Sequence, residues 1–407
     1  MTRILLLPLL PLLPLLAGAD WPQHLGPTRD GHSPETGLLR SWPKGGPAVL
    51  WSREVGSGWA GAAVAGDRLI LFHRIGDDEM VECLDPATGK PSWTAKYHTR
   101  YVDDFGFDNG PRATPLIADG RVFTFGAAGD LRAWELATGK GLWDRNVNKE
   151  FGVAKGFFGC ASSPLLIAGR LLVNVGAKGA GVVAFDPTTG QELWKAADDP
   201  VSYSSPVSAK VGGEELAVFF TRSGLLAVAP DKGEVRYAYP FRPRAQASVS
   251  AASPVVAGDR VFLSTAYGTG AALLDLKKGK AEEVWRGDDI LSCHYNTPLL
   301  IQGHLYGIDG RQEGGQAAMR CVEWETGKVR WTKAAFGCAG LVAADGLIIA
   351  SPENGDVVLI DPSPDGYKEL ARATVLERPA RALPALAGGR LFVRDGKRLV
   401  ALEVGKK

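Results

Sequence analysis

Net charge is almost absent from this chain, and that excludes two kinds of partner. The 46 lysines and arginines are balanced by 45 aspartates and glutamates, which leaves a formal charge of +1 over 407 residues. Binding to nucleic acid or to an anionic membrane surface depends on a basic excess. We therefore expect neither as a partner.

Histidine and cysteine are also scarce, which argues against a metal site. The six histidines are scattered, and only His294 lies beside a cysteine, Cys293. Zinc sites need such residues at short, regular spacings. A loop with Asp103, Asp104 and Asp108 offers oxygen ligands of the kind calcium prefers, but follows no calcium-loop pattern. We predict no metal site.

Catalytic motifs are missing as well. The sequence has no Ser-His-Asp arrangement, no paired-carboxylate motif and no glycine-rich phosphate loop followed by a helix. We predict no catalytic residues on these grounds.

Long apolar runs are limited to the N-terminus. Arg3 precedes an apolar stretch that ends in Ala17-Gly18-Ala19, a pattern typical of signal-peptide cleavage. The stretch is shorter than the ~20 residues of a membrane-spanning helix. We predict a signal peptide over residues 1–19, cleavage near Ala19, no membrane span in the mature chain, and a periplasmic or extracellular location.

Glycine, proline and tryptophan are abundant, and they occur in repeated phrases. One phrase joins an acidic residue to a Thr-Gly-Lys-like turn and then to an aromatic residue, as from Asp85 to Trp93 and from Asp186 to Trp194. A second phrase, Gly-Asp-Arg or a relative before a β-branched run, occurs eight times, around Gly66, Gly120, Gly169, Gly212, Gly258, Gly303, Gly346 and Gly388. Both phrases are typical of tight turns between strands.

The eight repeats predict an all-β, eight-bladed propeller of four-stranded antiparallel blades. Units of ~40–50 residues with four strands are the sequence sign of propeller blades. The chain ends before the eighth blade has its outer strand, while residues 48–55 resemble such a strand and belong to no blade of their own. We expect that N-terminal strand to complete the last blade and close the ring, which removes unpaired sheet edges. Residues 48–407 then form one domain, preceded by an irregular proline- and glycine-rich arm over 20–47 that lies along the propeller.

The turn phrases, such as Asp-Pro-Ala-Thr-Gly-Lys from Asp85 and Asp-Pro-Thr-Thr-Gly-Gln from Asp186, resemble those of PQQ-like (pyrroloquinoline-quinone-like) repeat propellers. The resemblance covers nearly all of the mature chain. It implies either of two known roles: a quinoprotein dehydrogenase that holds PQQ and calcium, or a noncatalytic scaffold of outer-membrane protein assembly. Many of those dehydrogenases have two adjacent bonded cysteines, whereas no cysteines are adjacent here. Cys293 and Cys338, from neighbouring blades, are the only plausible disulfide pair, and the sequence does not decide whether they bond.

Strand order in such a blade places the short turns on one face and the long, individual loops on the other, where function is expected. Alignment of the inner strands brings one residue from each blade to the mouth of the central channel. The candidate ligand-binding residues at this mouth are Trp59, Arg112, Tyr203, His294, Tyr295, Asn296, Arg311, Glu313 and Arg381. Their flat rings and guanidinium groups suit a planar or carboxylate-bearing ligand. The same residues could instead tie blades together.

We interpret the chain as a monomeric, noncatalytic propeller that binds a small planar or anionic ligand, or an envelope protein, through this face. One alternative is a PQQ-dependent alcohol or sugar dehydrogenase, with Trp59 or Tyr295 against the quinone and Glu313 as the base. The other is an envelope assembly scaffold that recognises extended strands.

Overall fold

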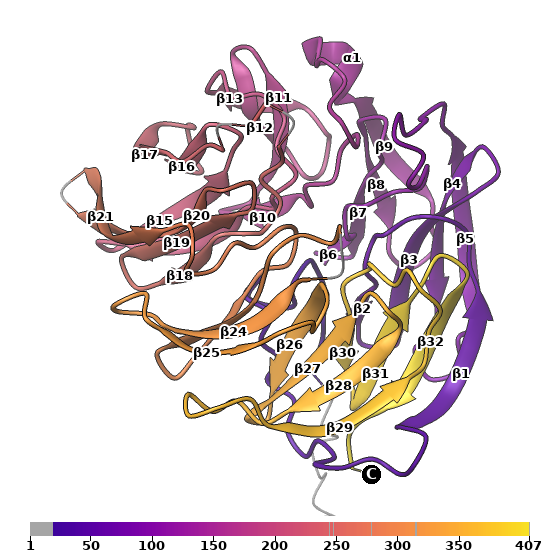
Figure 1. Ribbon diagram of the computed structural model, residues 1–407. Helices are drawn as coiled ribbons and strands as arrows, with labels where there is room; N and C mark the ends of the chain where they lie inside the picture. Colours follow the sequence, from indigo (N-terminus) through magenta and orange to yellow (C-terminus); the bar gives the residue numbers. More distant parts are fainter. Residues whose placement is uncertain (1–18, 244, 247, 278, 314–315, 407) are drawn as a thin grey trace, which may run out of the picture.

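The computed structural model describes residues 19–406 except 244, 247, 278, 314 and 315 (Figure 1). The predicted signal peptide, apart from Ala19, lies outside the described residues. The described chain forms eight four-stranded antiparallel sheets arranged as a ring of blades, so the predicted eight-bladed, all-β propeller is confirmed. Within the described residues, no helix is long and apolar enough to cross a membrane.

The first four blades run in chain order. Blade 1 contains β2 (Ala63–Ala65), β3 (Arg68–Ile75), β4 (Asp78–Leu84) and β5 (Pro91–His98). Blade 2 contains β6 (Leu116–Ala118), β7 (Arg121–Phe125), β8 (Asp130–Glu135) and β9 (Gly141–Asn146). Blade 3 contains β10 (Leu165–Ile167), β11 (Arg170–Ala177), β12 (Ala180–Phe185) and β13 (Glu192–Ala196). Blade 4 contains β14 (Val207–Val211), β15 (Glu214–Phe220), β16 (Gly224–Val228) and β17 (Val235–Pro240).

The remaining blades follow the same plan. Blade 5 contains β18 (Val255–Ala257), β19 (Arg260–Thr265), β20 (Gly270–Lys277) and β21 (Lys280–Gly287). Blade 6 contains β22 (Leu299–Ile301), β23 (His304–Asp309), β24 (Ala318–Glu323) and β25 (Val329–Lys333). Blade 7 contains β26 (Ala339–Ala344), β27 (Leu347–Pro352), β28 (Asp356–Ile360) and β29 (Glu369–Thr374). Blade 8 contains β30 (Ala385–Ala387), β31 (Arg390–Arg394), β32 (Arg398–Glu403) and, from the other end of the chain, β1 (Ala48–Glu54).

The ring closes through β1, as the sequence predicts. It pairs antiparallel with β32, with Ala48 opposite Glu403 and Glu54 opposite Arg398. Figure 1 shows this indigo strand beside the yellow C-terminal strands. Because β1 supplies the outer strand of blade 8, the first and last parts of the chain stabilise the same sheet.

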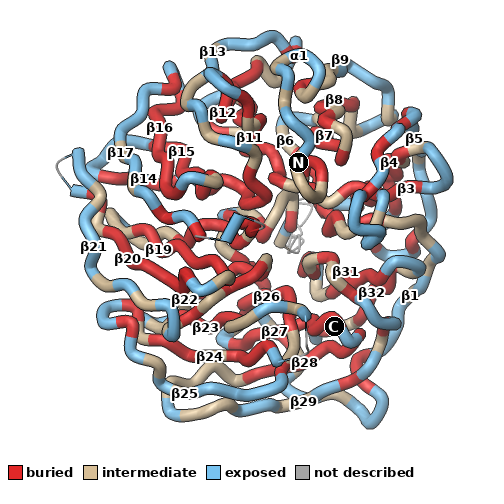
Figure 2. Tube along the Cα trace, turned by 45° about the horizontal axis from the view of Figure 1, so that its top comes forward, coloured by how far each residue is buried: buried red, intermediate tan, exposed pale blue. Residues whose placement is uncertain are grey.

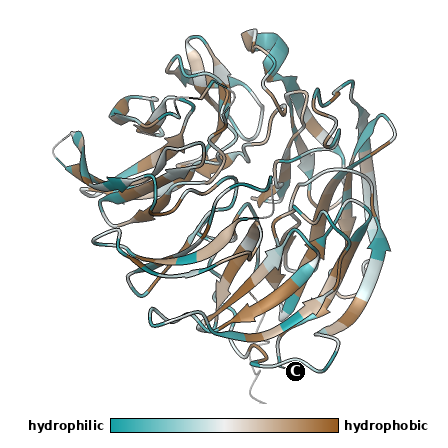
Figure 3. Ribbon diagram, viewed as in Figure 1, coloured by the Kyte–Doolittle hydropathy of each residue, from teal (hydrophilic) through white to brown (hydrophobic). Residues whose placement is uncertain are grey.

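Burial follows the position of a strand in its blade. The third strand β12 is buried at every residue, whereas the outer strand β13 alternates between exposed and half-buried residues. Figure 2 shows buried strands inside the ring and exposed segments at its rim, and Figure 3 shows that the strands contain hydrophobic stretches interrupted by hydrophilic residues. Strands covered on both faces by neighbouring blades require continuous apolar runs, since no side of the sheet meets water.

A tryptophan on the outer strand joins six of the eight blades to the next blade. The indole Nε1 of Trp143, on β9, donates to the carbonyl of Pro187 in the turn of blade 3, at 3.1 Å. The ring packs on Gly190 of that turn, where φ is 72° and a Cβ would lie 2.7 Å from the indole. The same N–H to carbonyl contact is made by Trp51 to Pro86, Trp93 to Leu136, Trp194 to Pro230, Trp285 to Trp324 and Trp331 to Ser363.

In the described part of the chain one short helix interrupts the all-β pattern, and the sequence did not predict it. Helix α1 (Val147–Phe151) follows β9 directly. Asn146 caps it by accepting the N–H of Lys149, and Gly152 ends it in the left-handed conformation. The helix begins the long loop that leads into blade 3.

Candidate functional site

A pocket of about 370 Å³ lies at the mouth of the channel, on the face of the long loops. Seven blades contribute the residue two places before the inner-strand serine, threonine or its equivalent: Trp59, Arg112, Ala161, Tyr203, Ala251, Tyr295 and Arg381. His294, Tyr267, Arg311 and Glu313 from blades 5 and 6 add to the wall. Eight of the nine candidate residues named from the sequence therefore surround one cavity.

Asn296 is the candidate that does not line this pocket. It is 2 % exposed, and neither polar atom of its side chain has a hydrogen-bond partner. Its neighbours His294 and Tyr295 both reach the pocket wall, while Asn296 lies within the structure behind them. His294 and Tyr295 lie in a bend of the loop into blade 6, where consecutive side chains need not point to opposite sides.

Two arginines lie against the indole of Trp59. The guanidinium carbons of Arg112 and Arg381 are 5.0 and 4.9 Å from its ring centroid. Arg112 is held by its own loop, because it donates to the carbonyls of Asp108 and Gly110 at 2.7 and 3.1 Å. Cation–π contacts of this kind fix the indole as a rigid part of the wall.

Each of the two arginines also lies near a carboxylate, at a distance longer than that of a charged hydrogen bond. Arg112 lies 3.7 Å from Asp103, and Arg381 lies 3.5 Å from Glu353. The buried Nε of each arginine makes no hydrogen bond.

Blades 5 and 6 form a second polar corner of the pocket. The hydroxyl of Tyr267 lies 3.0 Å from Nε2 of His294. The guanidinium carbon of Arg311 lies 4.4 Å from the centroid of the Tyr267 ring. The same guanidinium donates to the carboxylate of Glu313 at 2.9 and 3.0 Å. Burial lowers the pKa of His294 to about 4, so its ring is neutral near pH 7, and its Nδ1 has no partner. Tyr267 has φ 69°, an unusual conformation for a bulky residue and one found at functional sites.

Phenylalanines extend the pocket outward, and sequence reasoning missed them. Phe105 and Phe107, from the loop into blade 2, are 53 and 47 % exposed, and Phe105 packs on Phe157 and Phe158 from the loop into blade 3 at 5.9 and 5.3 Å. All four rings line the pocket. The sequence does show these aromatic residues in two long loops, where neither a turn nor the core requires them.

The N-terminal arm closes the other end of the channel, which the sequence did not predict. Trp21 pairs with Val64 of β2, and Ala343 of β26 donates to Gly31, so the arm crosses between blades 1 and 7. His24 lines the floor of the pocket and lies 3.1 Å from the hydroxyl of Ser253. Below it Arg29 is buried and donates to the carbonyls of Ser163, Pro164 and Pro206. The pocket is therefore open at one end and closed by the arm at the other.

The residues present do not fit PQQ held by calcium. Within the described part of the chain, no three histidine, cysteine, aspartate or glutamate side chains converge as metal ligands would. The acidic groups nearest the mouth, Asp103, Glu313 and Glu353, each face an arginine. Cys293 and Cys338 are buried thiols, without a disulfide, and burial raises the pKa of both to about 12.

Comparison with known sequences identifies relatives that match more than half of the chain. A family model described as "Outer membrane protein assembly factor BamB" matches residues 77–333. The protein of that name from Burkholderia pseudomallei is 24 % identical over 300 residues, covering 70 % of this chain and 72 % of that protein. Its namesake from Shewanella oneidensis is 25 % identical over 257 residues, covering 60 % of each.

Solved structures show the same fold in proteins with different names. BamB from Moraxella catarrhalis superposes with a TM-score of 0.64 and 14 % identity, covering 88 % of this chain and 98 % of that one. A europium-containing methanol dehydrogenase superposes with a TM-score of 0.67 and 15 % identity, covering 94 and 89 %. Likeness at this identity establishes the propeller and leaves function to the residues of the site.

Proposed function

Because the chain belongs to the outer membrane protein assembly factor BamB family of PQQ-like repeat β-propellers, we propose that it is a noncatalytic scaffold of the cell envelope. It binds a protein partner through the channel-mouth pocket. The relatives carry the name of an outer-membrane assembly factor, which supports an envelope location, as does the signal peptide expected over residues 1–19. In this proposal the propeller holds its partner and performs no chemistry on it.

The observation that carries the proposal is the exposed aromatic rim on a blind pocket. Phe105 and Phe107 leave about half of their side chains in water, directly beside a cavity lined by Trp59, Tyr203 and Tyr295. Exposed apolar patches of this kind mark interaction surfaces, and aromatic and arginine side chains dominate binding energy at protein interfaces. Arg112 and Arg381 supply the arginine side chains.

Site-specific photocrosslinking in cells tests the proposal. A photoreactive amino acid at Phe105 should capture an outer-membrane assembly protein, whereas the same group at Ala87, in a short turn of blade 1 on the opposite face, should not. The Arg112→Ala, Tyr295→Ala double variant should lose most of the Phe105 crosslink while it retains a folded circular dichroism spectrum.

The outcome against the proposal is equally specific. Equal capture of the same protein from Phe105 in the parent and the folded double variant would show that the pocket does not hold the partner. A purified propeller that binds only a small planar anion, and no envelope protein, would replace the scaffold with a ligand-binding function.

A further inference from the structure

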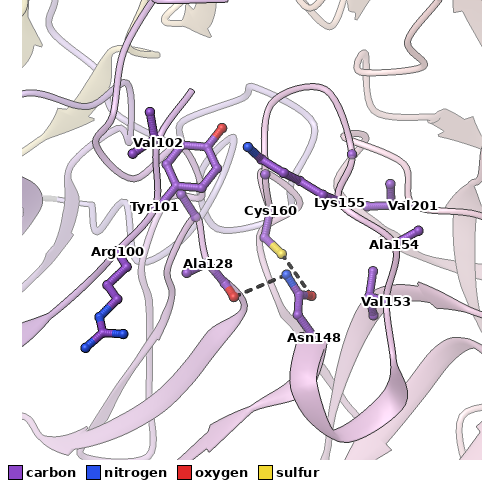
Figure 4. A pocket seen from close by; sticks show the side chains of 13 residues that line it. Arg100, Tyr101, Val102, Ala128, Asn148, Val153, Ala154, Lys155, Cys160 and Val201 are labelled. Atoms are coloured by element: carbon purple, nitrogen blue, oxygen red, sulfur yellow. Dashed lines mark hydrogen bonds between the residues drawn. The ribbon is translucent and has the colours of Figure 1, made fainter. Parts of the chain in front are cut away.

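A second cavity of about 350 Å³ lies on the same face, between the loops of blades 2 and 3 (Figure 4). Apolar and small residues make up most of its wall: Val102, Ala127, Ala128, Val153, Ala154, Gly156, Gly159, Cys160 and Val201. We call it the side cavity. It is nearly as large as the channel-mouth pocket, so it can take a large apolar side chain.

The polar groups of the side cavity are few, and one is unpaired. Asn148 of α1 donates to the carbonyl of Ala128 at 3.2 Å and lies 3.6 Å from the thiol of Cys160. Burial raises the pKa of that thiol to about 12, so Cys160 is a neutral part of the wall. Tyr101 is 6 % exposed, and its buried hydroxyl has no hydrogen-bond partner.

The side cavity and the channel-mouth pocket share a partition. Arg112, in the wall of the pocket, lies 5.3 Å from the ring centroid of Tyr101, in the wall of the side cavity. The loop into blade 3 contributes Val153 to one cavity and Phe158 to the other. The two cavities are therefore neighbours built by the same loops.

Exposed apolar side chains lie near the two openings. Val102, at the side cavity, is 59 % exposed, and Phe105 and Phe107, at the pocket, follow it in the same loop. Phe105 packs on Phe157 from the facing loop. These side chains place exposed apolar surface beside both openings, while Asp103 and Asp104 lie between Val102 and Phe105 in the chain.

Among the described residues, the side cavity has one positive charge at its rim that no carboxylate balances, that of Arg100. Arg100 and Lys155 line it and no acidic residue does. Lys155 pairs with Asp104 at 2.5 Å, whereas Arg100 forms no ion pair within the part of the chain that the structure describes. An acidic residue in the occupant would complement this rim.

We infer that the side cavity and the channel-mouth pocket together hold one extended polypeptide segment. Two large apolar side chains of the segment occupy the two cavities, and an acidic residue beside one of them faces Arg100. This inference rests on the proposed function and adds to it the chemistry of the partner. It also assigns a role to the side cavity, which has none if the partner binds only in the channel-mouth pocket.

Labelled peptides test the inference on the purified full chain. The probes are fluorescein-labelled Gly-Ser peptides that carry two phenylalanines at varied spacing with a flanking glutamate, measured by fluorescence anisotropy. At the best spacing, replacement of either phenylalanine by alanine should weaken binding about tenfold or more, because each cavity buries one ring. Replacement of the glutamate by lysine should weaken it further.

Cavity-filling variants assign each phenylalanine to its site. Ala154→Trp should fill the side cavity and Ala161→Trp the channel-mouth pocket, so that each variant binds two-phenylalanine and one-phenylalanine peptides with similar affinity. Ala87→Trp, on the opposite face, is the matched control and should bind as the parent does. Thermal unfolding and circular dichroism establish that each variant is folded.

The outcomes separate the inference from the proposed function. If Ala161→Trp weakens binding and folded Ala154→Trp does not, the two-cavity inference is overturned and the pocket keeps its partner. If no peptide binds, or if lysine-flanked peptides bind as well as glutamate-flanked ones, the inference also fails. The Phe105 crosslink in cells then decides the proposed function independently.

Discussion

The Nε of Arg29 donates a 2.7 Å hydrogen bond to the backbone carbonyl of Pro206, which lies 177 residues further along the chain. The other nitrogens of the guanidinium reach the carbonyls of Pro164 and Ser163 at 2.9 and 3.1 Å. Arg29 is 2 % exposed, and within the described residues it forms no ion pair. Burial lowers the pKa of its guanidinium to about 9. One side chain of the arm thus joins blades 3 and 4 at the closed end of the channel.

Replacement of Arg29 should therefore destabilise the whole propeller. Arg29→Met leaves three buried carbonyls without a donor, and each unsatisfied group costs roughly 1–3 kcal/mol. We expect the free energy of unfolding in urea to fall by about 3 kcal/mol or more. Arg40→Ala is the control, since Arg40 lies in the same arm but on the surface, and should change it by less than about 1 kcal/mol. Equal effects of the two substitutions would contradict the role given to Arg29.

Contacts between blades should depend on the indole N–H as well as on the ring. Trp143→Phe removes the hydrogen bond to Pro187 and should lower the free energy of unfolding by about 1 kcal/mol. Trp143→Ala also empties the space above Gly190 and should lower it by about 3 kcal/mol. Leu142→Ala, at an exposed position of the same strand, should have little effect. Denaturant titration would measure all three, and a neutral Trp143→Ala would be the contrary result.

Glu79 should make stability fall as the pH rises. It is fully buried, and burial raises its pKa, although the hydroxyl of Tyr97 and the N–H of Ala127 donate to it. A folded-state pKa above the unfolded one gives stability that is complete below the unfolded pKa of about 4.5 and is lost as the pH rises through the folded pKa. Glu79→Gln should flatten this loss in melting temperatures measured against pH. Glu54 is exposed, so Glu54→Gln should leave the dependence of melting temperature on pH unchanged. The same unchanged dependence in Glu79→Gln would contradict the role given to the Glu79 carboxyl.

His24 should have the opposite dependence, at lower pH. Burial, followed by the charge of Arg29, lowers its pKa from 6.5 to about 3. The unfolded chain then binds the proton more tightly, so His24 lowers stability progressively as the pH falls from about 6.5 toward 3. The melting temperature of His24→Gln should exceed that of the parent increasingly over this range. His98→Gln, on the outer strand of blade 1, should follow the parent, and parallel curves for His24→Gln and the parent would contradict the prediction.

The site could be predicted from the sequence only in part. Alignment of the repeats placed Trp59, Arg112, Tyr203, Tyr295 and Arg381 at one channel mouth, and the structure brings them around one pocket. That these residues bind a ligand stays a prediction. The alignment could not reveal the phenylalanine rim, because Phe105 and Phe157 lie in loops of different length that share no repeat position.

The sequence by itself determined the number of blades and the closure of the ring. Turn phrases act over a few residues. In six of the eight blades a tryptophan of the outer strand donates to a turn carbonyl of the next blade, so the repeat encodes both the blade and its neighbour. Only the tertiary structure decided that Arg29 would close the channel and that the side cavity would adjoin the pocket. Those features arise from contacts between segments far apart in the chain, whose meeting depends on the geometry of the complete ring.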